Sequence, residues 1–435
     1  VFWPQIMPFI AHPAHAGGTG VVNLHAHALE QPGPVLARID VDKSRFAGIG
    51  LRTLKAKRAF RAVLDVAQQP DARIESDAVA LDDVMRDELF QLLLRDTLIA
   101  DSEFEIMLTR LRAALLNDGG LRARAPLNFL YALAVQCFNG EFIYAESEAE
   151  GAQVAALTRE VEAGLQTTPA PAEPLLRSLA VLAMYRPLQP LRGIDALARS
   201  TPEPSAPGLL LRRSVLNLRT ERELRPAIET CGEITDEVSR SVREMYEEHP
   251  YPRWFSVDRR PPVAFADWVE REVPAMTPME LPAEVHVLVA GCGTGQEAIT
   301  LAVSLANARV LAVDLSRASL AYAQRMANEL GVANIEFRQG DILELGAMSG
   351  RFEMIYCNGV LHHLRDPRAG LRVLVGLLKP GGLLRLALYS ERARASVTAA
   401  RALIRERQIV PTEPAIREFR QFVVSAGRDA PVARI

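Results

Sequence analysis

A buried-strand pattern that runs directly into a glycine-rich turn is the feature that most constrains the fold of this chain. Residues 287–290 read Val-Leu-Val-Ala, and the next five, Gly291–Gly295, include three glycines. Glycine lets the backbone turn sharply and approach a ligand closely because it has no Cβ. A helix-compatible segment follows at 296–306, and the free N–H groups at its start point to the same place. The pattern predicts a strand, a turn and a helix around a nucleotide-type pocket.

A carboxylate that can bind a ribose follows the turn. Asp314 lies nineteen residues after Gly295, at the end of the strand-like segment 308–313. A carboxylate about 20 residues beyond such a turn can accept hydrogen bonds from both ribose hydroxyls. The pattern alone fits a dinucleotide or S-adenosylmethionine. A nicotinamide-binding turn requires a third glycine where Gln296 stands, so the spacing argues against a nucleotide-binding oxidoreductase.

Four landmarks in the C-terminal part of the chain resemble the class I S-adenosylmethionine-dependent methyltransferases. They are the glycine turn with Asp314, the acidic position in 340–342, the strand-and-loop segment 352–364, and the Leu-Lys-Pro-Gly-Gly turn at 378–382 before a fifth strand at 383–388. The resemblance implies an α/β fold with a C-terminal, Rossmann-like sheet that is parallel at its centre. A ligand would lie outside the carboxyl ends of the first and fourth strands.

The resemblance implies S-adenosyl-L-methionine as cofactor and S-adenosyl-L-homocysteine as its product. The implied cofactor site consists of Gly291, Cys292, Gly293, Gly295, Asp314, Leu315, Asp341, Ile342, Asn358 and Gly359. In this assignment Asp314 binds the ribose, Leu315 and Asp341 border the adenine, and Asn358 faces the methionine part. One position departs from the family, because Val289 stands where an acid is common two residues before the first glycine.

Two adjacent histidines are the predicted catalytic bases. Methyl transfer from a sulfonium depends mainly on geometry and on exclusion of water. A base helps only when the acceptor still carries a proton. His363 and His362 suit that role because histidine titrates near neutral pH; the alternative is that one caps the next helix and the other packs on the sheet. Tyr389, after the fifth strand, is a further candidate in the same cleft.

The segment 237–261 precedes the predicted sheet and contains four candidate lid or substrate residues, namely Tyr246, Tyr251, Arg253 and Trp254. Residues 238–246 read as a helix, and the prolines at 250 and 252 stiffen the loop that follows and bar it from a helix. It resembles a Tyr-Glu-Glu-Asn-Pro-Tyr-Pro-Arg-Trp element found before the methyltransferase domain in bacterial proteins with an N-terminal helical, often tetratricopeptide-type, region; here His249 replaces the asparagine. Both a hinge between domains and a lid over the cofactor fit this pattern.

The patterns divide the chain into four parts: an irregular segment 1–50, an all-helical region 51–236, the connecting segment 237–261 and the methyltransferase domain 262–435. In the helical region, Ser102 and Glu105 have capping-box spacing and predict a helix start. No convincing pair of strands follows Ser390, so we expect the last antiparallel strands to be missing. Because the chain begins with Val1 and stops at Ile435 soon after the fifth strand and its helices, we expect a fragment, a truncated reading frame or at least an incomplete sheet edge.

The composition of the chain limits the classes of partner and ligand that it is expected to bind. A net charge of -3 disfavours nucleic acid, and no apolar run is long enough to span a membrane. Four cysteines without a C-x-x-C spacing indicate reduced thiols of a cytoplasmic protein. No metal site is expected, since the N-terminal histidines lack cysteine or carboxylate at ligand spacing; these histidines are His12, His15, His25 and His27.

The predicted function is methyl transfer from S-adenosylmethionine to an O- or N-nucleophile of a small molecule or protein. The helical region is expected to offer a surface for a protein partner. The alternative is a helical interaction scaffold whose methyltransferase domain is degenerate. Val289 and the missing last strands favour that alternative.

Overall fold

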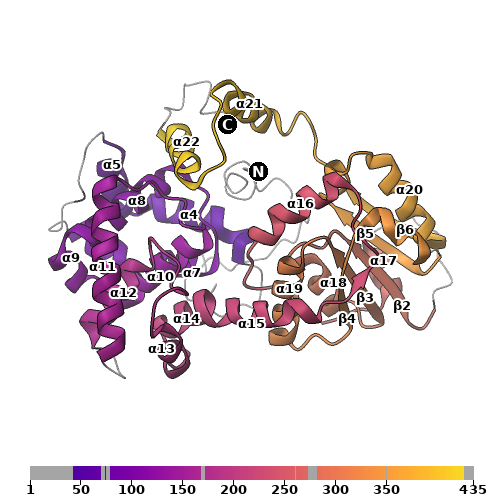
Figure 1. Cartoon of the computed structure of the whole chain (residues 1–435), viewed down its shortest axis with the longest axis horizontal. Helices are drawn as coiled ribbons and strands as arrows, with labels where there is room; N and C mark the ends of the chain where they lie inside the picture. The colour runs from indigo at the N-terminus through magenta and orange to yellow at the C-terminus, as the bar shows by residue number, and fades with distance from the viewer. Residues whose placement is uncertain are drawn as a thin grey trace. The chain divides into compact units, whose positions relative to one another are not determined.

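The chain forms two compact units in a computed structural model, which describes residues 43–69, 74, 79–167, 172–259, 261–272, 282–348 and 350–425. The first unit spans Val1–Leu218 together with Ala395–Ile435, and the second spans Arg219–Arg394 (Figure 1). The four N-terminal histidines lie outside the described residues. Within the described ranges, every helix is too short or too polar to cross a bilayer.

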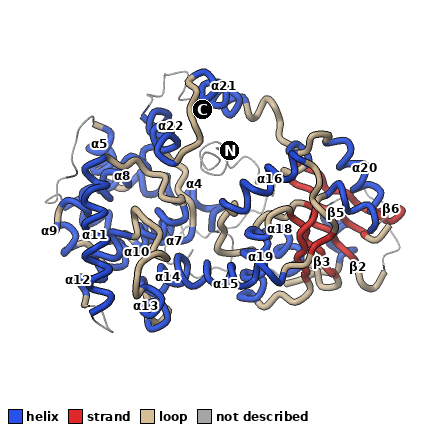
Figure 2. The backbone as a smooth tube through the Cα atoms, in the orientation of Figure 1, coloured by secondary structure: helices blue, strands red, loops and turns tan. Residues whose placement is uncertain are grey.

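Every regular element described in the first unit is helical (Figure 2). Its helices are η2 (Lys43–Phe46), α4 (Ala47–Ala56), α5 (Arg58–Gln68), α6 (Val79–Arg86), α7 (Glu88–Asp96), α8 (Ser102–Asn117), α9 (Gly119–Arg124), α10 (Leu127–Asn139), α11 (Glu148–Thr167), α12 (Glu173–Leu182), α13 (Ile194–Ser200), α14 (Ala206–Leu211), η3 (Arg212–Leu216), α21 (Ala395–Glu406) and α22 (Glu413–Ser425). The predicted methyltransferase domain ran to residue 435, whereas α21 and α22 group with the first unit. The predicted boundaries at 50, 236 and 261 stay predictions.

The start of α8 differs from the predicted capping box. Asp101 is the N-cap, and its carboxylate accepts hydrogen bonds from the backbone N–H groups of Glu103 and Phe104. Aspartate caps as well as serine does, so Ser102 becomes the first helical residue. Glu105 does not reach back to the cap, because its buried carboxylate pairs with Arg420 of α22.

The second unit contains a six-stranded sheet with the order β1-β4-β3-β2-β5-β6, and all five strand pairs are parallel. The strands are β1 (Thr230–Cys231), β2 (Val285–Ala290), β3 (Ala308–Asp314), β4 (Ile335–Gly340), β5 (Phe352–Asn358) and β6 (Leu378–Ala387). The helices are α15 (Asn217–Leu224), which begins in the first unit, and η4 (Arg225–Ala227), α16 (Glu237–Glu248), α17 (Phe265–Glu272), α18 (Gln296–Ser304), α19 (Arg317–Leu330), η5 (Ile342–Met348), η6 (Leu361–His363) and α20 (Pro367–Leu377). The predicted Rossmann-like sheet is confirmed. The two-residue strand β1 was not predicted.

Successive side chains of β2 pack on opposite faces of the sheet, and helices cover both faces. Val287 and Val289 belong to one core cluster with residues of α17, α18 and α19. Leu288 and Ala290 belong to another, with η5 and α20. Successive side chains of a strand point to opposite faces, and a parallel sheet covered by helices is apolar on both. Val289 is therefore a core residue, 2% exposed.

The described chain contains no strand after β6. It continues from Ala387 into α21 and α22. The expected absence of an antiparallel strand pair after Ser390 agrees with the part of this region that the structure describes.

Candidate active site

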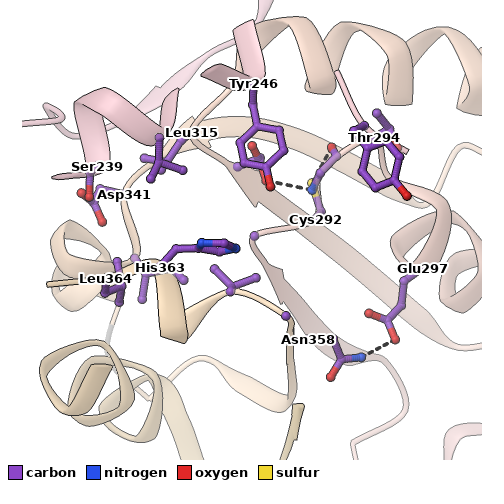
Figure 3. Close-up of a pocket in the computed structure, with 18 of the residues that line it drawn as sticks. Ser239, Tyr246, Cys292, Thr294, Glu297, Leu315, Asp341, Asn358, His363 and Leu364 are labelled. Carbon is purple, nitrogen blue, oxygen red and sulfur yellow. Dashed lines mark hydrogen bonds between the residues drawn. The ribbon is translucent and has the colours of Figure 1, made fainter. Parts of the chain in front are cut away.

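A cavity of about 330 Å³ lies where β2, β3, β4 and β5 end (Figure 3). The residues that follow these four strands line it, together with residues of α16, Tyr251, Pro252 and Tyr389 after β6. Its volume falls in the range of small-molecule sites. Ligands of open α/β sheets bind outside the carboxyl ends of the strands, so the cavity occupies the expected place.

Most of the predicted site residues line this cavity. They are Tyr246, Tyr251, Gly291, Cys292, Gly293, Asp314, Leu315, Asp341, Ile342, Asn358, Gly359, His363 and Tyr389. Four predicted residues are not part of the lining, namely Arg253, Trp254, Gly295 and His362. The topology thus brings together residues that are separated by more than a hundred positions in sequence.

Two glycines of the turn are required by packing inside the protein. Gly291 has φ +75°, and a Cβ there would lie 2.4 Å from a methyl group of Val360. Gly295 has φ +82°, and a Cβ there would lie 2.5 Å from the Cβ of Ala323. A positive φ strains other residues. These glycines hold the turn close to its neighbours, which leaves the turn around Gly293 beside the cavity.

Asp314 connects the end of β3 to the glycine turn. Its Oδ2 accepts a hydrogen bond from the N–H of Gly293 at 2.8 Å, and its Oδ1 accepts one from the N–H of Ser316 at 3.0 Å. Desolvation raises the pKa of Asp314, although these N–H groups oppose that rise. Each carboxylate oxygen has further acceptor capacity, so the group can also accept from hydroxyls of a ligand.

Asp341 offers the cavity an acceptor that the protein leaves unpaired. The residue is 2% exposed, and its Oδ1 accepts a hydrogen bond from the N–H of Leu343 at 3.0 Å. Its Oδ2 has no hydrogen-bond partner among the described residues. A buried polar atom without a partner is costly. A ligand N–H group placed there would relieve that cost.

A second unpaired acceptor lies at the end of β5. The Nδ2 of Asn358 donates to the Oε1 of Glu297 at 2.6 Å (Figure 3). The Oδ1 of Asn358 finds no partner within the described chain. Burial raises the pKa of Glu297, and the nearby Arg385 and the bond from Asn358 oppose the rise. Amide and carboxylate together make an acceptor-rich corner that suits an ammonium group.

Glu297 was not among the predicted site residues. The position where an acid is common before the glycine turn is Val289, which lies in the core. The acid stands instead in the first turn of α18, just after Gln296. The sequence signal for Glu297 was its position in the first turn of α18, because side chains there lie beside the glycine-rich loop that precedes the helix.

The segment before the sheet contributes to both the cavity wall and the core. Tyr246 and Tyr251 line the cavity, and burial raises the pKa of Tyr246. Trp254 is 4% exposed; its Nε1 donates to the carbonyl of Thr294 at 2.9 Å, and its backbone N–H donates to the hydroxyl of Tyr322 at 3.1 Å. The two tyrosines border the cavity, whereas Trp254 anchors the segment within the second unit.

The two histidines have different positions. His363 directs its ring into the cavity (Figure 3). The ring of His362 packs against that of Tyr389 at an interplanar angle of 37°, with the ring centroids 3.9 Å apart. His363 is therefore the histidine that a ligand can reach. Groups of metal-ligating side chains are absent from the described ranges.

The C-terminal part of the chain matches a known protein family. Residues 282–418 match a family described as "Methyltransferase domain". The chain contains a methyltransferase domain. Its parallel sheet, with a cavity at the strand ends, has the fold of the class I, S-adenosylmethionine-dependent methyltransferases. The finer resemblance, to bacterial proteins with a tetratricopeptide-type region and the Tyr-Glu-Glu-Asn-Pro-Tyr-Pro-Arg-Trp element, stays a prediction.

Three relatives match this methyltransferase domain over part of their length. Trans-aconitate 2-methyltransferase of Deinococcus radiodurans is 39% identical over 126 residues, which cover 29% of this chain and 45% of that protein. Ubiquinone biosynthesis O-methyltransferase of Azotobacter vinelandii is 30% identical over 158 residues, covering 36% and 63%. An uncharacterized protein of Synechococcus sp. is 36% identical over 165 residues, covering 37% and 40%. The chain thus spans less than two thirds of each relative.

Solved structures also match the methyltransferase domain. One is a methyltransferase from Aquifex aeolicus, 17% identical, with a TM-score of 0.24, covering 35% of this chain and 72% of that one. Another is a Haemonchus contortus N-methyltransferase bound to S-adenosylhomocysteine, 20% identical, with a TM-score of 0.26, covering 35% of each chain. Scores this low carry no argument about function.

Proposed function

We propose that this chain transfers a methyl group from S-adenosylmethionine to an acceptor at the cavity described above. The observation that carries the proposal is the pair of unpaired buried acceptors, Asp341 Oδ2 and Asn358 Oδ1. An adenine amino group fits the first and an ammonium group fits the second. S-adenosylmethionine, when bound, supplies a methyl group activated on a sulfonium.

Each of the following cavity residues is proposed to have one role in binding the donor, excluding water or accepting a proton. Asp314, held by backbone N–H groups, accepts from the ribose hydroxyls. Asp341 accepts from the adenine, and Asn358 with Glu297 binds the ammonium. Tyr246 covers the cavity and helps to exclude water. His363 accepts the proton of an acceptor that still carries one.

We propose a hydroxyl of a small molecule or protein as the acceptor. The name of the Azotobacter relative specifies an O-methyltransferase, and a histidine within the cavity supports an acceptor that must lose a proton. The helices of the first unit are proposed to bind a protein partner. Nucleic acid is not expected, because the net charge is -3.

Replacing Asp341 by asparagine tests the proposed function directly. Asparagine has nearly the same shape, but its amide presents donors where the adenine amino group needs an acceptor. We expect S-adenosylhomocysteine to bind about 10-fold more weakly, because a hydrogen bond to a charged group contributes about 1.5 kcal/mol or more. Isothermal titration calorimetry with the full chain measures this, and urea unfolding should show no loss of stability.

The matched control is Asp267→Asn, an exposed aspartate on α17 that does not line the cavity. Equal affinities of the two variants would contradict the adenine assignment. If the wild-type chain bound no S-adenosylhomocysteine at millimolar concentration, the proposed enzyme would be wrong, and the helical scaffold with a degenerate domain would replace it.

Glu297→Gln is expected to change how binding depends on pH. Burial raises the pKa of Glu297, so part of its population stays protonated above the ordinary glutamate value of about 4.3. An ammonium group prefers the ionised carboxylate. Affinity for S-adenosylhomocysteine should therefore rise as the pH increases above the ordinary glutamate pKa and Glu297 loses its proton.

In Glu297→Gln the increase of affinity with pH should become shallower. Some pH dependence should persist because the pKa of Asp314 is also raised. Glutamine keeps an oxygen that can accept from Asn358, so the geometry is retained. Titration calorimetry across the pH range measures both slopes. Parallel slopes would exclude Glu297 from the ammonium site.

A further inference from the structure

Helix α16 presents one face to the cavity. Ser239, Val242 and Tyr246 all line it, and steps of three and four residues place side chains on one side of a helix. We call this face, formed by these three residues, the roof. The Oγ of Ser239, a residue 1% exposed, has no hydrogen-bond partner among the described residues. Ser239 and Asp341 both line the cavity.

The roof helix is mostly exposed or half-buried. Of the residues of α16, only Ser239 is buried. A helix of this length is marginal without packing, so polar contacts at its ends must fix its position. At its start Asp236 caps the helix by accepting from the N–H of Ser239 at 3.0 Å. At its end the contacts converge on the first turn of α19.

Glu247 makes the most specific of these contacts. Its Oε1 accepts a hydrogen bond from the N–H of Arg317 at 2.5 Å, and its Oε2 accepts one from the N–H of Ala318 at 3.2 Å. These are two of the N–H groups that the start of a helix leaves unpaired. A carboxylate there also interacts favourably with the helix dipole. Beside it, the Oγ of Ser316 donates to the carbonyl of Tyr246 at 2.9 Å.

The same loop holds the ribose-binding carboxylate. Asp314 lies two residues before Ser316 and accepts its backbone N–H. The negative charge of Glu247 is among the influences that raise the pKa of Asp314. Glu247 therefore fastens the roof to the loop that carries Asp314 and Leu315. One side chain couples two walls of the cavity.

We infer that Glu247 is a positioning residue: by capping α19 it holds Tyr246 and the rest of the roof over the bound donor. This inference rests on the proposed function for its ligand. The roof closes behind the donor, so loss of the Glu247 contact opens an exit. Dissociation of the donor should accelerate more than association slows.

The test compares Glu247→Ala and Glu247→Gln with Glu248→Ala. Glu248 is the neighbouring residue, with a side chain 77% exposed, and is the matched control. The dissociation rate of S-adenosylhomocysteine, measured by stopped-flow competition, should rise about 10-fold or more in Glu247→Ala, as expected for loss of charge-assisted hydrogen bonds. Glu247→Gln keeps an acceptor and should show a smaller rise. Glu248→Ala should match the wild type.

Hydrogen exchange without ligand separates this inference from the proposed function. In Glu247→Ala the amides of residues 237–248 should exchange faster, whereas those of β2 should be unchanged, which excludes general unfolding. Unaltered exchange in α16, or a dissociation rate equal to that of Glu248→Ala, overturns the inference. If the wild-type chain does not bind S-adenosylhomocysteine, the proposed function is wrong. The hydrogen-exchange result then decides by itself whether Glu247 holds the roof in place.

Discussion

Replacing Asp314 by asparagine is expected to weaken binding of S-adenosylhomocysteine about 100-fold. Two ribose hydroxyls would each lose a charge-assisted hydrogen bond, together about 3 kcal/mol. The carboxylate also accepts from the N–H groups of Gly293 and Ser316. Asparagine has one acceptor oxygen, so one of these bonds is lost and the glycine turn loosens. Both effects lower affinity.

The stability of Asp314→Asn should change much less than its affinity. Desolvation raises the pKa of Asp314, which means that the charged form is disfavoured in the folded protein. Neutral asparagine removes that cost and offsets part of the lost backbone bond. Calorimetry gives the affinity and urea unfolding gives the stability, with Asp267→Asn as the exposed control. A loss of affinity below about threefold would contradict the ribose assignment.

Replacing Arg420 by methionine is expected to destabilise the first unit by about 3–5 kcal/mol. The Nε of Arg420 donates to one oxygen of Glu105 at 2.7 Å and an Nη to the other at 2.8 Å. The two side chains are only 8% and 6% exposed. Without the guanidinium, a buried carboxylate is left unpaired. Burial already raises the pKa of Glu105, so its charge is costly in the folded state.

A double variant distinguishes pairing from packing. Adding Glu105→Met to Arg420→Met removes the unpaired charge, and most of the lost stability should return. Arg405→Met, an exposed change in α21, is the control. Urea unfolding followed by far-UV circular dichroism measures the stability, and hydrogen exchange of α8 locates the effect. Equal stability of Arg420→Met and Arg405→Met would contradict a structural role for the pair in holding α22 to α8.

The glycine turn and its flanking elements were predictable because their signals are local. The apolar run of β2 indicates a strand covered on both faces. Glycines at 291 and 295 mark positive φ, which the structure shows at both. The position of Asp314 follows from the length of one strand-helix-strand unit. These features depend on periodicity and on backbone sterics, and both are properties of short stretches of chain.

Other parts of the site depend on contacts between segments far apart in sequence. Glu247 caps a helix that begins 70 residues later, and no local pattern marks it as a partner. Glu297 enters the cavity because α18 starts beside β5, where Asn358 meets it. The choice between the two histidines also required geometry, since only His363 reaches the cavity.

The sequence by itself determined the class of the sheet and the turn that borders the ligand. Only the tertiary structure decided which carboxylates have unpaired oxygens, which helix covers the cavity, and that α22 pairs with α8 across 315 residues. The capping-box spacing at Ser102 and Glu105 illustrates the difference. Asp101 is the N-cap of α8, and the distant Arg420 forms an ion pair with Glu105. A buried charge is stabilised by whichever partner the tertiary packing places beside it.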